Sequence, residues 1–272
     1  MAAVSRRAFL GATAVVPVAA AVSLPTSAAT RRWIEGGLPA SFPTQDPEVA
    51  QQVVGKSHVD IDAVRELVTA RPELAKAAWD WGFGDWETAL GAASHVGRPD
   101  IAKVLIAHGA RPDMFTFAML GQVDVIRALC VANPGIQKIH GPHGITLMQH
   151  AINAGEAGND VVSYLRELGD ADIAPPNTPL DAAAAAPYMG DYIPGAGVAP
   201  EMVLHIQHHE RRQCLTFTRD DRSMRFLLNT GKDTFAPSGS PSVVITFAMD
   251  EGTAQSMTIR DGAMVVEAAR AQ

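Results

Sequence analysis

The residues of this sequence that could do chemistry are histidines and acids in its first half. Imidazole and carboxylate groups are common metal ligands and common acid–base catalysts. Together they could form a polar pocket for a small ligand or a metal. The residues concerned are His95, His140, His143, His150, Asp80, Asp85 and Glu87. Neither H-x-x-x-H nor H-E-x-x-H occurs among them. We therefore favour a structural role in which His143 and His150 bond loop backbones, and we predict no metal, no cofactor and no catalytic residue.

Beside these groups lies an aromatic stretch, "WDWGFGDW", at residues 79–86. It holds three of the four tryptophans of the chain. Glycines on both sides of Phe83 let the backbone project that ring without a side-chain penalty. We expect Trp81 and Phe83 to be exposed in a solvated loop with Asp80 and Asp85, and Trp79 and Trp86 to be packed. The alternative is that the rings cover the edge of the preceding helices.

The elements that carry these residues have a helical pattern. In "ETALGAASHVGRPDIAKVLIAHGARPD", small Ala92 and Ala93 permit close helix approach, and Gly97 permits a tight turn. The segment resembles an ankyrin repeat, and the pattern returns at "HGITLMQHAINAGEAGNDVVSYLRELGD". A shortened copy lies between them, and a degenerate first copy precedes them. The histidine typical of the family is replaced by Gly91 and Gln149.

The resemblance covers residues 48–170 and implies a helical solenoid with a concave binding face. It places the tryptophan stretch in a projecting finger and several histidines near the same face. The binding residues expected from it are Trp81, Phe83, Asp80, Asp85, His95, His143 and His150.

A proline- and alanine-rich linker precedes a region of alternating apolar residues. Short strands are predicted at "MVLHIQ", "CLTFT", "MRFLL", "VVITFAM", "QSMTIR" and "MVVEAAR". Residues 188–270 resemble the accessory β domain of exported serine-β-lactamase-like hydrolases, which implies a small antiparallel barrel or curved sheet. The nucleophile motifs S-x-x-K and G-x-S-x-G are absent from the sequence. We therefore predict that the chain is not an enzyme.

The N-terminus has the features of an export signal. Ser5-Arg6-Arg7-Ala8-Phe9-Leu10, followed by an apolar run, resembles the twin-arginine signal, the alternative being an ordinary secretory signal. The apolar run is too short to span a bilayer. We predict cleavage near Ala29 and a periplasmic or extracellular protein without a membrane span.

The net charge argues against some classes of partner, and the cysteine spacing argues against a disulfide scaffold. Without residues 1–29 the chain has 20 lysines and arginines against 29 acids, a net charge of −9. An acidic chain without a basic stripe argues against nucleic acid and anionic membranes. Cys130 and Cys214 show no scaffold-like spacing, so two buried free thiols are expected.

The sequence thus predicts an α + β protein of two domains, an ankyrin solenoid followed by a small antiparallel β domain. The expected segments are a signal at 1–29, an extended segment at 30–47, the solenoid at 48–172, a linker at 173–187 and the β domain at 188–272. The expected function is binding of a protein or a small ligand. The alternatives are an enzyme with a histidine–carboxylate site on the helical face and a ligand carrier that uses the β domain.

Overall fold

The computed structural model describes residues 41–195, 202–219, 222 and 224–271. The predicted export signal at residues 1–29 lies outside these residues. Among the described residues, no helix is long and apolar enough to cross a membrane.

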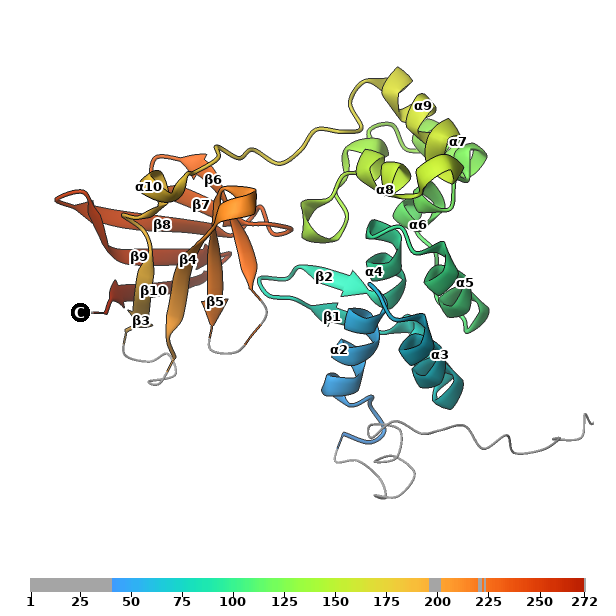
Figure 1. Ribbon diagram of the computed structural model, residues 1–272, viewed down its shortest axis with the longest axis horizontal. Coiled ribbons are helices and arrows are strands. Elements are labelled where there is room, and N and C mark those ends of the chain that lie inside the picture. The colour runs from blue at the N-terminus through green and yellow to red at the C-terminus, as the bar shows by residue number, and fades with distance from the viewer. Residues whose placement is uncertain (1–40, 196–201, 220–221, 223, 272) are drawn as a thin grey trace, which may run out of the picture. The chain divides into compact units, whose positions relative to one another are not determined.

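The first described region, residues 47–168, is built from short α-helices (Figure 1). Several begin at a side chain that accepts a hydrogen bond from the first turn, as Asp60, Thr88, Asp113 and Thr146 do. The α-helices are α2 (Pro47–Lys56), α3 (Ile61–Ala70), α4 (Ala89–His95), α5 (Pro99–Ala107), α6 (Met114–Met119), α7 (Val123–Ala132), α8 (Leu147–Asn153) and α9 (Asn159–Leu168). The 3-10 turns are η1 (Pro72–Lys76), η2 (Ile136–Lys138), η3 (Pro142–Gly144) and η4 (Gly155–Gly158).

The predicted ankyrin solenoid is wrong. In the part of the chain that the structure describes, there are nine short α-helices and a closed barrel, and no solenoid of ankyrin repeats is indicated. A solenoid needs equivalent units that stack one on the next. Here a leading hairpin forms only before α4 in the described chain, while 3-10 turns precede α8 and α9. Gly97 and Gly121 do have positive φ, so the local turn signals were right, but they do not specify a repeat.

The hairpin before α4 consists of β1 (Ala78–Asp80) and β2 (Trp86–Thr88), paired antiparallel. Its loop has three successive residues with positive φ, Gly82, Phe83 and Gly84. The Asp80 carboxylate accepts the backbone N–H groups of both glycines, at 2.8 and 3.1 Å, and so stabilises this tight loop. The glycines in the aromatic stretch are explained by this backbone conformation.

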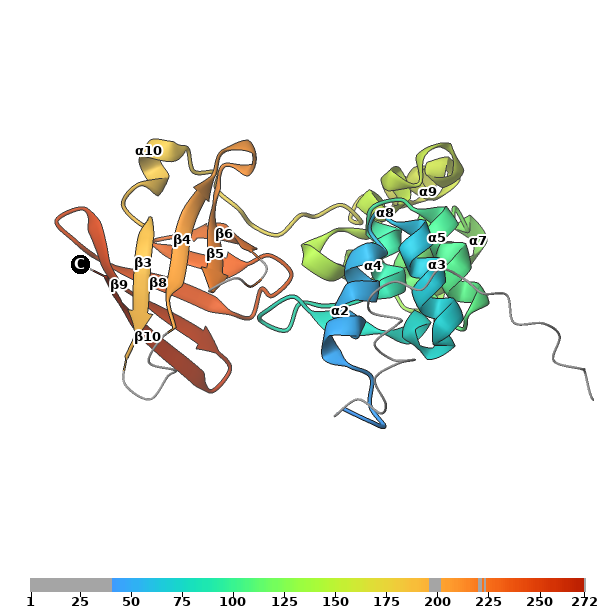
Figure 2. The ribbon, with the colours of Figure 1, turned by 60° about the horizontal axis from the view of Figure 1, so that its bottom comes forward.

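The C-terminal region is a closed antiparallel barrel of eight strands in the order β10-β3-β4-β5-β6-β7-β8-β9 (Figure 2). The prediction of a small antiparallel barrel or curved sheet therefore fits in part. The barrel closes where β10 pairs with β3. Its strands are β3 (Gly190–Pro194), β4 (Leu204–His209), β5 (Cys214–Arg219), β6 (Arg225–Gly231), β7 (Thr234–Pro237), β8 (Val244–Asp250), β9 (Thr253–Asp261) and β10 (Met264–Arg270), with α10 (Ala182–Ala185) before β3 and η5 (Glu210–Arg212) before β5.

Side chains fill the inside of the barrel. Tyr192, Leu215, Phe235 and Phe247 belong to one apolar cluster there, as expected for a small barrel with a packed interior. Part of the predicted linker at 173–187 packs with the barrel, since Leu180 is buried in the same apolar cluster. Cys130 and Cys214 are free and buried, as their spacing predicted.

Candidate metal centre

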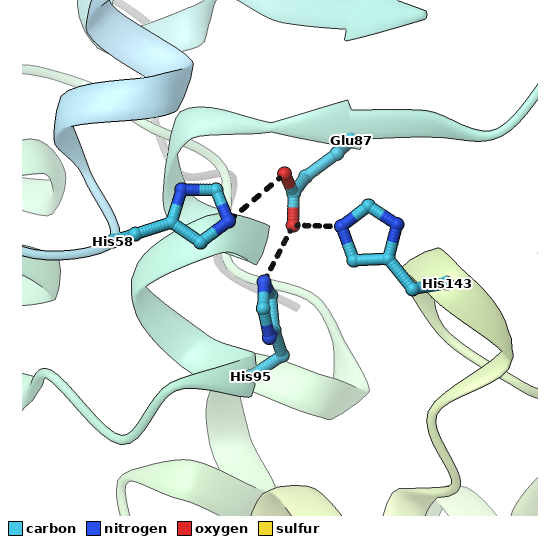
Figure 3. Close-up of side chains that lie close together, drawn as sticks. All are labelled: His58, Glu87, His95 and His143. Carbon is cyan, nitrogen blue, oxygen red and sulfur yellow. Dashed lines mark ion pairs between the residues drawn. The ribbon is translucent and has the colours of Figure 1, made fainter. Parts of the chain in front are cut away.

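Three histidines and one glutamate meet at a point where four elements approach one another. His58 follows the end of α2, Glu87 is the middle residue of β2, His95 ends α4 and His143 lies in η3. Each of the four side chains offers one ligand atom, and these atoms all lie within 4.8 Å of one another. Figure 3 shows the three imidazoles turned toward the Glu87 carboxylate.

The distances between these groups suit a single small cation. The Nε2 atoms of His95 and His143 lie 3.0 and 3.4 Å from Glu87 Oε1, and His58 Nε2 lies 3.5 Å from Oε2. In a tetrahedral zinc site with bonds of about 2.0–2.1 Å, neighbouring ligand atoms are about 3.3–3.4 Å apart. The distances from His95 and His143 to Glu87 Oε1 are close to that edge length, whereas His58 is nearest to Oε2 and the four ligand atoms are spread over up to 4.8 Å.

Two of these atoms make no hydrogen bond, although Glu87 Oε1 also lies 3.4 Å from His143 Nε2. Glu87 Oε1 and His95 Nε2 are both buried, and neither makes a hydrogen bond. They are 3.0 Å apart but lack hydrogen-bond geometry. An unsatisfied buried polar atom costs about 1–3 kcal/mol, so two of them facing each other require an explanation.

The other polar atoms of the same side chains are held by neighbours. Trp81 Nε1 donates to Glu87 Oε2 at 2.7 Å. His58 Nδ1 lies 3.0 Å from the Gly55 carbonyl, and His143 Nδ1 lies 2.6 Å from Asp85 Oδ2. Such contacts orient metal ligands and leave the opposite atom, here Oε1 or Nε2, directed at the centre.

Asp85 holds His143 in an unusual backbone conformation. His143 has φ of +62°, in the left-handed region that few residues other than glycine adopt. One Asp85 oxygen accepts the His143 backbone N–H at 2.9 Å, while the other faces the imidazole. Asp85 also accepts a hydrogen bond from Arg225 at the start of β6. Gly239 packs so closely that an added Cβ would stand 2.4 Å from Asp85 Oδ1.

The carboxylates of Glu87 and of the neighbouring Asp85 have lowered pKa values and are ionised. Burial raises the pKa of Glu87, but the contacts with His143 and His95 outweigh it and lower the pKa to about 2. Burial lowers the pKa of His143, but the facing carboxylates of Asp85 and Glu87 raise it to about 9. Burial also lowers the pKa of His58, despite the nearby charge of Glu87. Without a metal, His143 is therefore an imidazolium at neutral pH and carries a proton that a metal would replace.

The three histidines also line a cavity of about 820 Å³. Barrel residues, among them Arg212 and Arg225, form another part of its wall. Glu87 is only 1% exposed and does not line this cavity. The cluster thus has a buried carboxylate on one side and room for a small molecule beside its imidazoles.

The structure brings together some of the site residues predicted from the sequence and separates others. His95 and His143 face Glu87, and Asp85 bonds His143, whereas His150 is 0% exposed, bonds the Thr146 carbonyl through Nδ1 and packs on Phe115. The Asp80 carboxylate accepts a backbone hydrogen bond in the hairpin loop and takes no part in the cluster.

Three expectations about the aromatic stretch are wrong. Trp81 and Phe83 are half-buried, with the Phe83 ring centroid 5.1 Å from that of Phe217 in the barrel. Trp86, expected to be packed, is 64% exposed. Asp85, expected to be solvated, is 3% exposed.

Sequence reasoning missed His58 and gave Glu87 no role of its own. A signal for Glu87 exists, because alternate residues of a strand face the same side. Asp85 and Glu87 therefore share one face, opposite Trp86, and two acids on an inward face suggest a site. We find no comparable local signal for His58. It lies 29 positions before Glu87 and is placed only by the packing of α2.

No protein-family model, curated protein or solved structure matches the chain. Function is carried by the chemistry of a site rather than by a fold.

Proposed function

We propose that the chain is a metal-dependent enzyme whose centre is a single divalent transition-metal ion bound by His58, Glu87, His95 and His143. The observation that carries this proposal is the pair of facing buried atoms, Glu87 Oε1 and His95 Nε2, neither of which makes a hydrogen bond. A cation between them would satisfy both atoms at once.

The hydrogen bonds that the proposed ligands make with their neighbours support the same proposal. A structural hydrogen-bond network would use both atoms of each polar group. Here Trp81, the Gly55 carbonyl and Asp85 each engage the outer atom of a proposed ligand, and the inner atoms of these side chains lie close together. This arrangement is typical of metal-ligating histidines and carboxylates.

The ligand set favours zinc or a neighbouring first-row metal. Three imidazoles suit zinc, copper, iron and nickel, while magnesium and calcium prefer oxygen ligands. The charges also fit, because Arg225 compensates Asp85 and leaves Glu87 to offset part of the metal charge.

The cavity beside the histidines favours catalysis over a purely structural role. A four-coordinate ion can accept a fifth ligand, and a cavity of about 820 Å³ lies within the usual range for small-molecule sites. Such an ion supplies Lewis acidity or an activated water. The competing view is an ion-pair network without metal, in which the His143 imidazolium joins Asp85 and Glu87.

A second candidate function, binding of a partner through the hairpin, is favoured by one observation. The ring of Trp86 is 64% exposed, and exposed tryptophans often form the centre of interfaces. The half-buried Trp81 and Phe83 no longer support this function.

Metal analysis of the purified full chain tests the main proposal. We expect about one equivalent of a transition metal by mass spectrometry, its loss on chelation, and tetrahedral d–d bands after loading with Co²⁺. Added azide should change these bands if the ion has an open position. The metal centre would be contradicted if the chain took up no Co²⁺. It would also be contradicted if the Glu87→Gln variant bound Co²⁺ as tightly as the unchanged protein. If azide did not change the bands, the metal centre would be structural and not catalytic.

A further inference from the structure

The cavity beside the histidine cluster has a distinctive charge pattern. None of the described residues that line it is Asp or Glu, although the chain as a whole has 29 acids and a net charge of −7. Its charged lining, apart from the histidines, consists of Arg212 and Arg225. The cavity is therefore suited to a negatively charged ligand.

Only one of the two arginines is available to such a ligand. The buried Arg225 bonds the Asp85 carboxylate and the Ser238 carbonyl. The Arg212 guanidinium lies 4.3 Å from the centre of the Phe226 ring, and no carboxylate of the described chain pairs with it. Stacking on an aromatic ring fixes a guanidinium plane while leaving its N–H groups free for a carboxylate.

Apolar residues line the rest of the cavity. Val96 and Met224 are 37% and 43% exposed, and Ile145 and Phe226 also line the wall. Exposed apolar side chains that gather in one concave site mark a place where apolar ligand surface can be buried. The side-chain amides of Gln149 and Asn153 add a few polar groups.

From these features we infer that the cavity binds a small organic carboxylate with an apolar body. The carboxylate pairs with Arg212, the body lies against the apolar wall, and the other end reaches the histidine cluster. A single free guanidinium matches a monoanion, whereas a phosphate dianion calls for more positive charge. Only the contact with the metal rests on the proposed function. The contact with Arg212 does not.

Calorimetric titration of the full chain with benzoate and with its uncharged counterpart benzamide tests this inference. We expect the metal-loaded protein to bind benzoate at least about tenfold more tightly than benzamide, since a charged hydrogen bond contributes about 1.5–3 kcal/mol. Arg212→Gln should weaken benzoate about tenfold and leave benzamide unchanged. Arg211→Gln, one position away on the same turn and outside the cavity lining, is the matched control and should change neither.

Equal affinity for the two probes, no binding of benzoate at millimolar concentration, or equal effects of Arg211→Gln and Arg212→Gln would overturn the inference. The same titration with the metal-free Glu87→Gln protein separates it from the proposed function. Benzoate binding that still depends on Arg212 in a protein that takes up no metal would support the anion site and refute only the metal centre. Metal uptake without a preference for benzoate would refute only the anion site.

Discussion

The helical region and the barrel bury different kinds of side chain. Of the eleven polar or charged residues buried in the described chain, eight belong to the helical region and its hairpin, and three belong to the barrel. In the barrel, closed ladders satisfy the backbone groups, so apolar side chains can fill the interior. In the helical region, short elements of unequal length come close together: His58 follows α2, His95 ends α4 and His143 lies in the three-residue turn η3. The cluster that we propose as a metal centre lies among the short, irregular elements rather than in the barrel.

The two regions meet at Asp85. This carboxylate holds His143 of the cluster and Arg225 of the barrel at the same time. Ser238 of the barrel also donates to the His143 carbonyl, at 2.5 Å. The barrel therefore supports the cluster and contributes part of the cavity wall, whereas the four side chains of the cluster come from the helical region and its hairpin.

The sharpest test of this division is Glu87→Gln. Structural zinc sites contribute about 10–16 kcal/mol through four ligands, so the loss of one should weaken metal binding by about a thousandfold, or ~4 kcal/mol. Competition with a chromophoric chelator measures this change. Glu267→Gln on an exposed position of β10 is the control from the barrel and should leave the affinity unchanged. If Glu87→Gln and Glu267→Gln bound metal with the same affinity, the helical region would not be the region that binds the metal.

Asp85→Asn tests the junction between the regions. Because Asp85 orients His143, the variant should lose about 10–100-fold in metal affinity. It should also lose about 3 kcal/mol in free energy of unfolding, since the buried Arg225 charge is left without its partner. Asp80→Asn on the same hairpin, where the side chain bonds only the loop backbone, should leave metal affinity unchanged. Chelator competition and urea unfolding give the two values, and an intact affinity in Asp85→Asn would show that His143 needs no orientation.

A buried histidine outside the cluster should make the stability of the helical region sensitive to pH. Burial lowers the pKa of His150 from 6.5 to about 4 in the folded chain, against the weaker effect of its bond to the Thr146 carbonyl. Between these pH values the unfolded chain binds a proton that the folded chain does not, so acidification favours unfolding. Stability that is fully present above pH 6.5 is lost as the pH falls toward 4, by about 3 kcal/mol.

Urea unfolding of the metal-free protein at several pH values measures this loss. His150→Gln, which does not titrate, should show a shallower decrease between pH 6.5 and pH 4.5. His205→Gln on strand β4 of the barrel is the control and should retain the slope of the unchanged protein. Parallel curves for the unchanged protein and His150→Gln would exclude this histidine as the cause.

A smaller effect is expected from Trp81→Phe, which keeps an aromatic ring but removes the N–H that donates to Glu87 Oε2. Metal affinity should fall by up to about tenfold, because one hydrogen bond to a charged ligand contributes about 1.5 kcal/mol. Trp79→Phe on β1 of the same hairpin is the control. If Trp81→Phe and Trp79→Phe changed the metal affinity by the same small factor, the role of Trp81 would be packing alone.

Much of the barrel could be predicted from the sequence, because alternation is a local signal. All six predicted strands occur, at β4, β5, β6, β8, β9 and β10. The strands β3 and β7 were not predicted as separate strands. β7 has four residues and ends in proline, so it is too short to show a period.

The candidate site could be predicted only in part. His95 and His143 were recognised as polar groups of one face, but the four residues of the cluster, His58, Glu87, His95 and His143, are separated by 29, 8 and 48 positions along the chain. Such spacing is produced by tertiary packing and leaves no motif. The ankyrin resemblance also misled the assignment of the hairpin, because it placed Trp81 and Phe83 at a projecting tip. In the structure Phe83 packs against the barrel instead.

The smallest expected effect concerns the other face of the strand that carries Glu87. Trp86 precedes Glu87 on β2, and successive side chains of a strand point to opposite faces. An exposed Trp86 is therefore the counterpart of a buried Glu87. Trp86→Ala should change the free energy of unfolding by less than about 0.5 kcal/mol, as is usual for surface positions, and should leave metal affinity unchanged. Trp81→Ala, which removes a half-buried ring and the bond to Glu87, should cost more in both. Thermal and urea unfolding measure these differences. A loss of about 3–5 kcal/mol in Trp86→Ala, the value for a packed aromatic ring, would mean that β2 presents its other face to the helices. Glu87 would then point to solvent, and the metal centre would lose its carboxylate.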